Sequence, residues 1–493
     1  MKRSFLTLAN GDPSPAASRE RAETANGGSR RAPRKVLVLA YRFPPQGGGG
    51  VQRTLKFVKY LPGRGWTPVV HTVSNPYWPL EDATLLSEVP HSVKVYRTPT
   101  FEFERLGRAA DSLMSTDGYA STGDGRSPSA GGSAPAPRKR GGPVRRGLKA
   151  VGDFLFRFVL IPDPQVAWLP GALARSLIIA RREGVSLVYS SSPPNSGQVL
   201  ALLVKRLSGR PWVADFRDEW TEGIRRKLAY QKSPLRGRIE AALERLVVRH
   251  ADHVVVTTDK ALDHFLVKYP FAPREKFSVI TNGFDPDDFE VAPAAERLLD
   301  DRDFNVTLTG NVEAMFDAVP FLSAVRELAD EDEGFQAHLR VNFVGTRRGK
   351  YDDFIRDNRL ERNVRYVGYV PHRVSLRYLA ESAVLFLCQI PVYESASTKL
   401  SGKLFEYLYM RKPILALTLP GLTADILSRS GLGTVVDPSD RPGMKKALRE
   451  LYLAWRGGHA SPPADEAYIG EFDRVRQTGR LAVLFDRLVG RPA

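Results

Sequence analysis

The segment 398–417, TKLSGKLFEYLYMRKPILAL, constrains the fold of this chain more than any other. A polar turn with a glycine comes first, and the apolar residues between Leu404 and Met410 follow helical spacing. Lys412 and Pro413 end the predicted helix, and residues 414–417 predict a short buried strand. A loop, a helix and a strand in this order are typical of parallel α/β sheets.

The start of this predicted helix carries residue types that suit a nucleotide diphosphate. Free backbone N–H groups of residues 401–403 would carry the positive end of the helix dipole, and Gly402 would let a phosphate approach the backbone closely. Lys403 adds a full positive charge, and Glu406 shares its helix face, where a carboxylate could accept hydrogen bonds from two ribose hydroxyls. An ordinary first turn with an i,i+3 ion pair accounts for the same residues equally well.

The same segment resembles the donor-binding segment of the GT4-type, or group 1, glycosyltransferases, which often reads GKLFEYLAAGRPILA. The resemblance implies an α/β chain of the GT-B fold, with two Rossmann-like domains facing a central cleft. Many members carry two glutamates eight positions apart. Here the second is Glu406, but the first position holds Thr398, so the chain departs from the family at the usual contact to the donor sugar.

A glycine-rich loop follows the first predicted strand. Residues 36–40 are apolar, YRFPPQGGGG comes next, and residues 51–61 read as a helix whose first turn carries Arg53, facing the cleft or solvated. Four glycines allow close backbone approach, although flexible surface loops also contain such runs. The spacing is neither a dinucleotide fingerprint nor a P-loop. The segment resembles the first strand–loop–helix of the same family, where this loop lies near the donor phosphates.

Polar residues also follow the predicted strand 212–214, in the segment DFRDEW. The carboxyl end of a parallel strand is where open α/β sheets place their sites, so Asp215, Arg217 and Asp218 are candidates for orienting an acceptor. Helix capping and a local ion pair are the alternative. Many retaining members have a histidine in this region, and DFRDEW contains none.

The resemblance completes the expected donor site. The segment TGN, which follows the predicted strand 305–308, would face the donor phosphates. The Arg and Lys that the family often has near this loop are absent here, and Lys399 or Arg347 could supply positive charge instead. GYVPH would hold the nucleotide base. The expected donor-binding residues are Gly48, Gly49, Gly50, Gly310, Asn311, Tyr369, Val370, Thr398, Lys399, Gly402, Lys403, Leu404 and Glu406.

No metal site is expected, because Asp285, Asp287 and Asp288 read as turn residues and GT-B enzymes generally lack a metal-binding Asp motif. No cofactor is expected either, since the nucleotide-diphosphate sugar is a co-substrate. Cys388 is the one cysteine, so a disulfide framework is excluded and a cytoplasmic location is favoured.

The predicted organisation has five parts. They are a disordered basic tail (1–33), an acceptor-side domain (34–290) with a disordered linker insertion (115–146), a nucleotide-sugar-binding domain (303–466), and a C-terminal helix (467–493) that crosses back to the first domain.

The formal net charge of +17 indicates an anionic partner. No apolar run approaches the roughly 20 residues of a membrane span. The segment 138–160 combines a basic run with an apolar helical face, which favours binding to an anionic membrane surface over packing on the domain. No nucleic-acid partner is expected, because no recognised nucleic-acid module is present.

Together these observations predict a retaining, metal-independent glycosyltransferase. It would move a sugar from a nucleotide-diphosphate donor to a lipid-linked or envelope polysaccharide acceptor at the cytoplasmic face of the membrane. A sugar-nucleotide epimerase on the same fold and a non-catalytic, membrane-peripheral scaffold are the alternatives.

Overall fold

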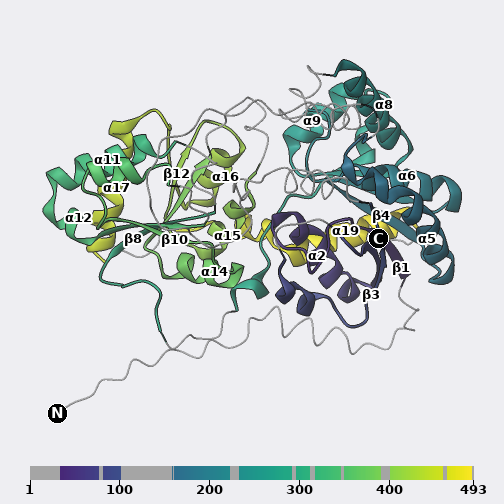
Figure 1. Ribbon diagram of the computed structural model, residues 1–493, viewed down its shortest axis with the longest axis horizontal. Helices are drawn as coiled ribbons and strands as arrows, with labels where there is room; N and C mark the ends of the chain where they lie inside the picture. The colour runs from purple at the N-terminus through teal and green to yellow at the C-terminus, as the bar shows by residue number, and fades with distance from the viewer. Residues whose placement is uncertain are drawn as a thin grey trace, which may run out of the picture.

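The computed structural model describes residues 34–76, 81–101, 158, 160–222, 233–290, 296–310, 317–345, 349–389, 400–458 and 463–490. Within these ranges the chain forms two parallel β-sheets with helices packed on them, which appear as two lobes in Figure 1. The α/β class predicted from the sequence is therefore confirmed. The predictions for the tail, the linker insertion, 138–157, Asn311, Arg347, Thr398 and Lys399 lie outside the described residues.

The first sheet has seven parallel strands in the order β3-β2-β1-β4-β5-β6-β7. The strands are β1 (Arg34–Leu39), β2 (Trp66–Val73), β3 (Lys94–Thr98), β4 (Leu187–Ser192), β5 (Trp212–Phe216), β6 (His253–Val256) and β7 (Phe277–Val279). The chain runs outward from β1 on one side and from β4 on the other. The strand order therefore reverses between β1 and β4, and open sheets place their ligands at such a point.

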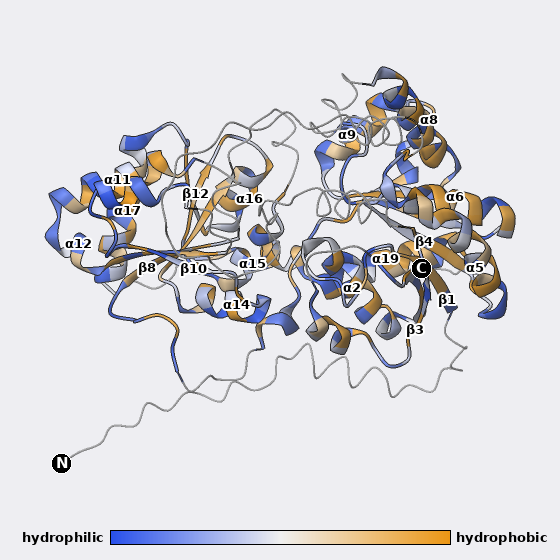
Figure 2. Ribbon diagram, in the orientation of Figure 1, coloured by the Kyte–Doolittle hydropathy of each residue, from blue (hydrophilic) through white to orange (hydrophobic). Residues whose placement is uncertain are grey.

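The second sheet has six parallel strands in the order β10-β9-β8-β11-β12-β13. The strands are β8 (Phe304–Thr309), β9 (Leu339–Val344), β10 (Val364–Gly368), β11 (Val384–Gln389), β12 (Ile414–Thr418) and β13 (Gly433–Val436). Here the order reverses between β8 and β11. Both sheets are covered on their faces, so their strands read as apolar runs, and Figure 2 shows this as orange strands beneath helices with blue outer faces.

Helices cover both sheets. The first lobe carries α2 (Gly49–Tyr60), α5 (Leu169–Arg182), α6 (Ser196–Ser208), α8 (Pro234–His250) and α9 (Asp259–Lys268). The second lobe carries α11 (Val319–Glu331), α12 (Glu333–His338), α13 (Asp352–Asp357), α14 (His372–Glu381), α15 (Gly402–Met410), α16 (Leu422–Ser430), α17 (Arg441–Arg456) and α18 (Glu466–Ile469). No helix among these described elements is long and apolar enough to cross a membrane.

The last helix, α19 (Arg474–Leu488), packs on the first lobe although the chain before it belongs to the second (Figure 1). Leu481 and Phe485 are fully buried in the same core as β1. The Phe485 ring meets Trp66 edge to face, with ring centroids 5.3 Å apart. This packing places the start of α19, at Arg474, between the two lobes.

Candidate active site

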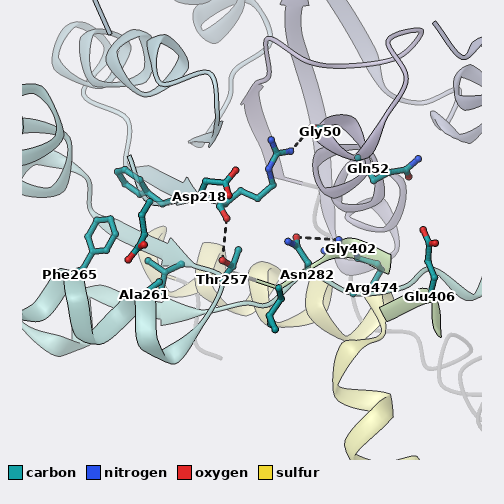
Figure 3. A pocket seen from close by; sticks show the side chains of 17 residues that line it. Gly50, Gln52, Asp218, Thr257, Ala261, Phe265, Asn282, Gly402, Glu406 and Arg474 are labelled. Carbon is teal, nitrogen blue, oxygen red and sulfur yellow. Dashed lines mark hydrogen bonds between the residues drawn. The ribbon is translucent and has the colours of Figure 1, made fainter. Parts of the chain in front are cut away.

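A cavity of about 370 Å³ lies between the lobes, and both lobes line it (Figure 3). The first lobe and the segment after β7 contribute Gly49, Gly50, Gln52, Phe216, Arg217, Asp218, Glu219, Val256, Thr257, Ala261, Phe265, Asn282 and Gly283. The second lobe contributes Leu400, Gly402 and Glu406, and α19 contributes Arg474. The cavity thus joins the carboxyl ends of β5 and β6 to the start of α15.

The start of α15 offers backbone N–H groups toward this cavity. The helix begins at Gly402, and its N-cap residue Ser401 makes no side-chain capping hydrogen bond. Gly402 is exposed and lines the cavity, and no atom lies within 4 Å of where its Cβ would be. An uncapped helix start with an open approach is suited to an anion.

Lys403 lies against Gly310, the residue that follows β8. Gly310 has a φ of 106°, and a Cβ built on it would stand 1.9 Å from Nζ of Lys403. Burial lowers the pKa of Lys403 to about 8, an effect that the negative charge of Glu406 partly offsets. The structure therefore brings together two residues predicted for donor phosphates from segments 93 positions apart in the sequence (403 less 310).

Glu406 lines the cavity one turn further along α15. It is hydrogen-bonded by His372, a residue that the sequence analysis did not assign to the site. Nε2 of His372, the first residue of α14, donates to Oε1 of Glu406 at 3.0 Å. Burial lowers the pKa of His372, but this hydrogen bond and the Glu406 charge outweigh it, so the pKa is raised above its usual value. Oε2 of Glu406 has no hydrogen-bond partner in the described part of the chain.

Several described residues predicted for the donor do not line the cavity, namely Gly48, Gly310, Lys403, Leu404, Tyr369 and Val370. The Leu404 side chain is fully buried in the core, and its N–H already donates to the Ser401 carbonyl, which corrects its assignment as a donor contact. Tyr369 is 66 % exposed, and neither it nor Val370 lines the cavity. His372, two residues later in the same GYVPH segment, is the residue from this loop that reaches the site.

The glycine run forms the opposite wall. Gly48 precedes α2 with a φ of 89°, and Gly49 and Gly50 line the cavity. A Cβ on Gly50 would lie 3.2 Å from the Arg42 side chain and 3.8 Å from that of Arg217. A side chain at position 50 would therefore press on Arg42, which would have to shift.

Asp215 is not available to an acceptor. Its carboxylate is fully buried and accepts two hydrogen bonds from Arg53, at 2.8 and 2.9 Å, and further bonds from Tyr189 and Ser191. Asp215 is therefore not the acceptor-orienting residue that its position predicts, and Arg53 faces neither the cleft nor solvent. The two opposite charges form an ion pair inside the first lobe. Asp215 caps no helix in the described residues.

Arg217 and Asp218 do line the cavity, as their positions after β5 predict. The Arg217 guanidinium donates to the Gly50 carbonyl and so connects the end of β5 to the glycine loop. Burial lowers the pKa of Arg217, although the charges of Asp218 and Asp215 act in the opposite direction. Gln52 adds a buried Oε1 with no hydrogen-bond partner among the described atoms, which suits a hydroxyl donor on a ligand.

Two family models match the chain. The model described as "Glycosyl transferase 4-like domain" matches residues 48–283, and the one described as "Glycosyl transferases group 1" matches residues 303–453. The chain belongs to the GT4-type, group 1 glycosyltransferases. Comparison with curated proteins gave no match.

Solved structures show the same fold as this glycosyltransferase. Anabaena Alr3699/HepE in complex with UDP and glucose is 14% identical, with a TM-score of 0.53 over 92% of this chain and 100% of that one. Sucrose-phosphate synthase from Thermosynechococcus elongatus is 12% identical, with a TM-score of 0.57 over 93% and 99%. WaaG, described as involved in lipopolysaccharide biosynthesis, is 16% identical, with a TM-score of 0.50 over 91% and 99%. The predicted GT-B fold is confirmed.

The acidic residues after β7 form ion pairs in this glycosyltransferase. Glu88, Asp285 and Asp288 are the acidic group that lies close enough to hold a metal among the described residues. The ammonium of Lys56 makes ion pairs with all three and takes the position that a cation would need. Asp285 also accepts from the Asp287 N–H, in keeping with its predicted place in a turn.

Proposed function

We propose that this glycosyltransferase moves a sugar from a nucleotide-diphosphate donor to a lipid-linked or envelope polysaccharide acceptor, with retention at the anomeric carbon and without a metal ion. The observation that supports this most is that Gly402 and Glu406 line the cavity at the start of α15, the helix that also carries Lys403. The HepE structure, which has the same fold, is a complex with UDP and glucose, and this favours a uridine nucleotide.

Each group in or beside the cavity would have a defined task. Oε2 of Glu406 would accept from a ribose hydroxyl while His372 holds Oε1. The N–H groups at the start of α15 and the ammonium of Lys403 would stabilise the diphosphate as it leaves with an extra negative charge. Asp218, on the facing wall, would orient the acceptor hydroxyl. Closure of the lobes would exclude water and limit hydrolysis of the donor.

We place the reaction at the cytoplasmic face of the membrane, since a chain with a net charge of +17 is attracted to anionic lipid. Retention and metal independence follow the family resemblance. The stereochemistry of the product by NMR and turnover in excess EDTA test these two statements directly.

Nucleotide binding tests the core of the proposal. Thermal shift with UDP, GDP, CDP and dTDP, without metal, should give stabilisation by one nucleotide, about 2.7 kcal/mol at a hundredfold excess over its dissociation constant. Lys403→Ala should reduce that shift, and Lys446→Ala, an exposed lysine in the same lobe, should not. If no nucleotide stabilises the wild type, a non-catalytic scaffold becomes the better description.

A further inference from the structure

Two arginines line the cavity without an acidic partner. Arg474 is 4 % exposed, and its guanidinium donates to Oε1 of Gln477 at 3.0 Å and to Oδ1 of Asn282 at 3.5 Å. Arg217 donates to the Gly50 carbonyl. Among the described residues, neither guanidinium forms an ion pair with a carboxylate. Their partners are amide and carbonyl oxygens, which carry no net charge.

The neighbouring Arg53 differs from these two arginines, because it forms an ion pair with a carboxylate. Its charge is neutralised by the two oxygens of Asp215, and Oδ1 of Asn282 lies 3.4 Å from Arg53 and 3.5 Å from Arg474. Asp215 already accepts hydrogen bonds from Arg53, Tyr189 and Ser191, and it forms no ion pair with Arg474. Within the described ranges, Arg217 and Arg474 therefore have no carboxylate hydrogen-bonded to them, and the nearby charges of Asp215 and Asp218 do not prevent burial from lowering the pKa of either guanidinium.

A buried cation without a counter-ion destabilises a fold, because its lost hydration is not replaced by an opposite charge. Burial lowers the pKa of Arg474 to about 9, in agreement with this environment. An incoming anion would supply the missing charge. Arginine is also well suited to such a ligand, since its planar donors match the oxygens of phosphates and carboxylates.

We propose that Arg474 and Arg217 bind an anionic group of the acceptor, a phosphate or a carboxylate, on the first-lobe side of the cavity. This inference rests on the proposed function, because it names the acceptor class for the same site. The position favours the acceptor over the donor: Arg217 follows β5 and α19 packs on the first lobe, whereas the charged groups predicted for the donor, Lys403 and Glu406, lie on α15 of the second lobe. Figure 3 shows Arg474 beside Asn282.

The test uses the full chain and inorganic phosphate as the probe, by calorimetric titration with and without saturating UDP. UDP fills the donor side, so phosphate that binds in its presence reports a second subsite. We expect the wild type to bind phosphate in both conditions. Arg474→Gln should weaken that binding by about tenfold or more and leave the UDP dissociation constant within about twofold, because charged hydrogen bonds are lost only at the second subsite.

Three further variants make the result specific. Arg217→Gln should also weaken phosphate binding, and Arg474→Lys should keep part of it because the charge remains. Arg476→Gln, an exposed arginine on the same helix, should bind phosphate and UDP like the wild type. Arg474→Gln should not lower the melting temperature of the ligand-free protein, since it removes an uncompensated buried charge.

The outcomes separate the sources of the anion. Wild-type phosphate affinity in Arg474→Gln, or no phosphate binding beside UDP, overturns the inference. If UDP displaces phosphate and Arg474→Gln weakens UDP equally, the guanidinium belongs to the donor diphosphate and the acceptor assignment is wrong. If phosphate binds through Arg474 while no nucleotide binds, the anion subsite is real and the proposed transferase function is what fails.

Discussion

Gly310 and Lys403 occupy adjoining space so closely that a methyl group on the glycine would stand 1.9 Å from Nζ of the lysine. Gly310 also has a φ of 106°, which L-amino acids with a side chain rarely adopt. The absence of a side chain at Gly310 therefore has two effects: it permits the positive φ, and it leaves room for the Lys403 ammonium. This relationship yields the first prediction.

Gly310→Ala should displace the Lys403 ammonium and reduce nucleotide-diphosphate affinity by about tenfold, the loss of one charge-assisted contact. It should also cost roughly 1–3 kcal/mol of stability through backbone strain. Gly458→Ala is the control, because Gly458 has a φ of 64° with no atom within 4 Å of the added Cβ. It should lower stability slightly and leave affinity unchanged. Equal affinity losses in both variants would contradict the proposed role of Gly310.

Nucleotide affinity should depend on pH through Lys403. Burial lowers the pKa of Lys403 from 10.5 to about 8, so the ammonium is charged at pH 7 and loses its proton through pH 8. A bound diphosphate favours the charged form, so binding above pH 8 takes up a proton and weakens as pH rises. Titrations from pH 6.5 to 9.5 should show this slope in the wild type, and Lys403→Gln should lack it. Identical slopes would exclude Lys403 as the group concerned.

The same lowered pKa makes a separate prediction for stability. Between about pH 8 and 10.5 the unfolded chain holds a proton at Lys403 that the folded chain has released, so unfolding takes up a proton. The free energy of unfolding of the wild type, compared with that of Lys403→Gln, should therefore rise with pH over this window. Denaturant unfolding at pH 7.5, 9 and 10 measures the difference, and a falling difference would contradict the assignment.

Glu406 should recognise the ribose rather than the base. Glu406→Ala should weaken UDP binding by at least tenfold. The wild type should bind UDP more tightly than whichever analogue, 2′-deoxy-UDP or 3′-deoxy-UDP, lacks the ribose hydroxyl that Glu406 contacts. Glu406→Ala should bind UDP and that analogue with similar affinity. His372→Gln should give a smaller loss, because it removes only the hydrogen bond that holds Oε1. Glu466→Gln, an exposed glutamate that pairs with Arg411 at the end of α15, is the control. Retained discrimination in Glu406→Ala would assign the ribose contact elsewhere.

The sequence predicted most of the fold because the relevant signals are local. The strands of both sheets are short apolar runs bounded by turns. The loop, the helix α15 and the strand after it can be predicted from the segment 398–417 alone. The residues at the start of that helix were predicted for the same reason: Gly402 and Glu406 share one helix start by local geometry, and both line the cavity.

The parts that sequence reasoning missed depend on contacts between distant segments. Arg53 and Asp215 are 162 positions apart, and no pattern near either of them indicates that one neutralises the other. Arg474 falls within the predicted C-terminal helix 467–493 without any signal of its own, and its place in the cavity follows from how α19 packs on the first lobe. His372 had a signal, since it ends the GYVPH segment, but its contact to Glu406 spans 34 positions.

Variants of Asp215 and Asp218 distinguish a carboxylate that stabilises the fold from one that acts on the substrate. Burial raises its pKa, but the charge and hydrogen bonds of Arg53 outweigh this and hold the pKa below its usual value, so the pair's stabilisation is present at neutral pH and lost only in acid. Asp215→Ala leaves the Arg53 guanidinium buried and unpaired, which should lower the free energy of unfolding by roughly 3–5 kcal/mol. The double variant Arg53→Met, Asp215→Ala should recover part of that loss, because no isolated charge remains.

Urea unfolding of the two single variants, the double variant and Asp218→Ala measures this coupling. Asp218→Ala should keep the wild-type midpoint and lose transfer activity, since Asp218 lines the cavity and would orient the acceptor. The converse pattern, with a wild-type midpoint and lost activity in Asp215→Ala, would return Asp215 to the acceptor role that its position after β5 suggests. A buried bidentate pair makes that pattern unexpected, because Asp215 has no exposed surface through which to reach a substrate.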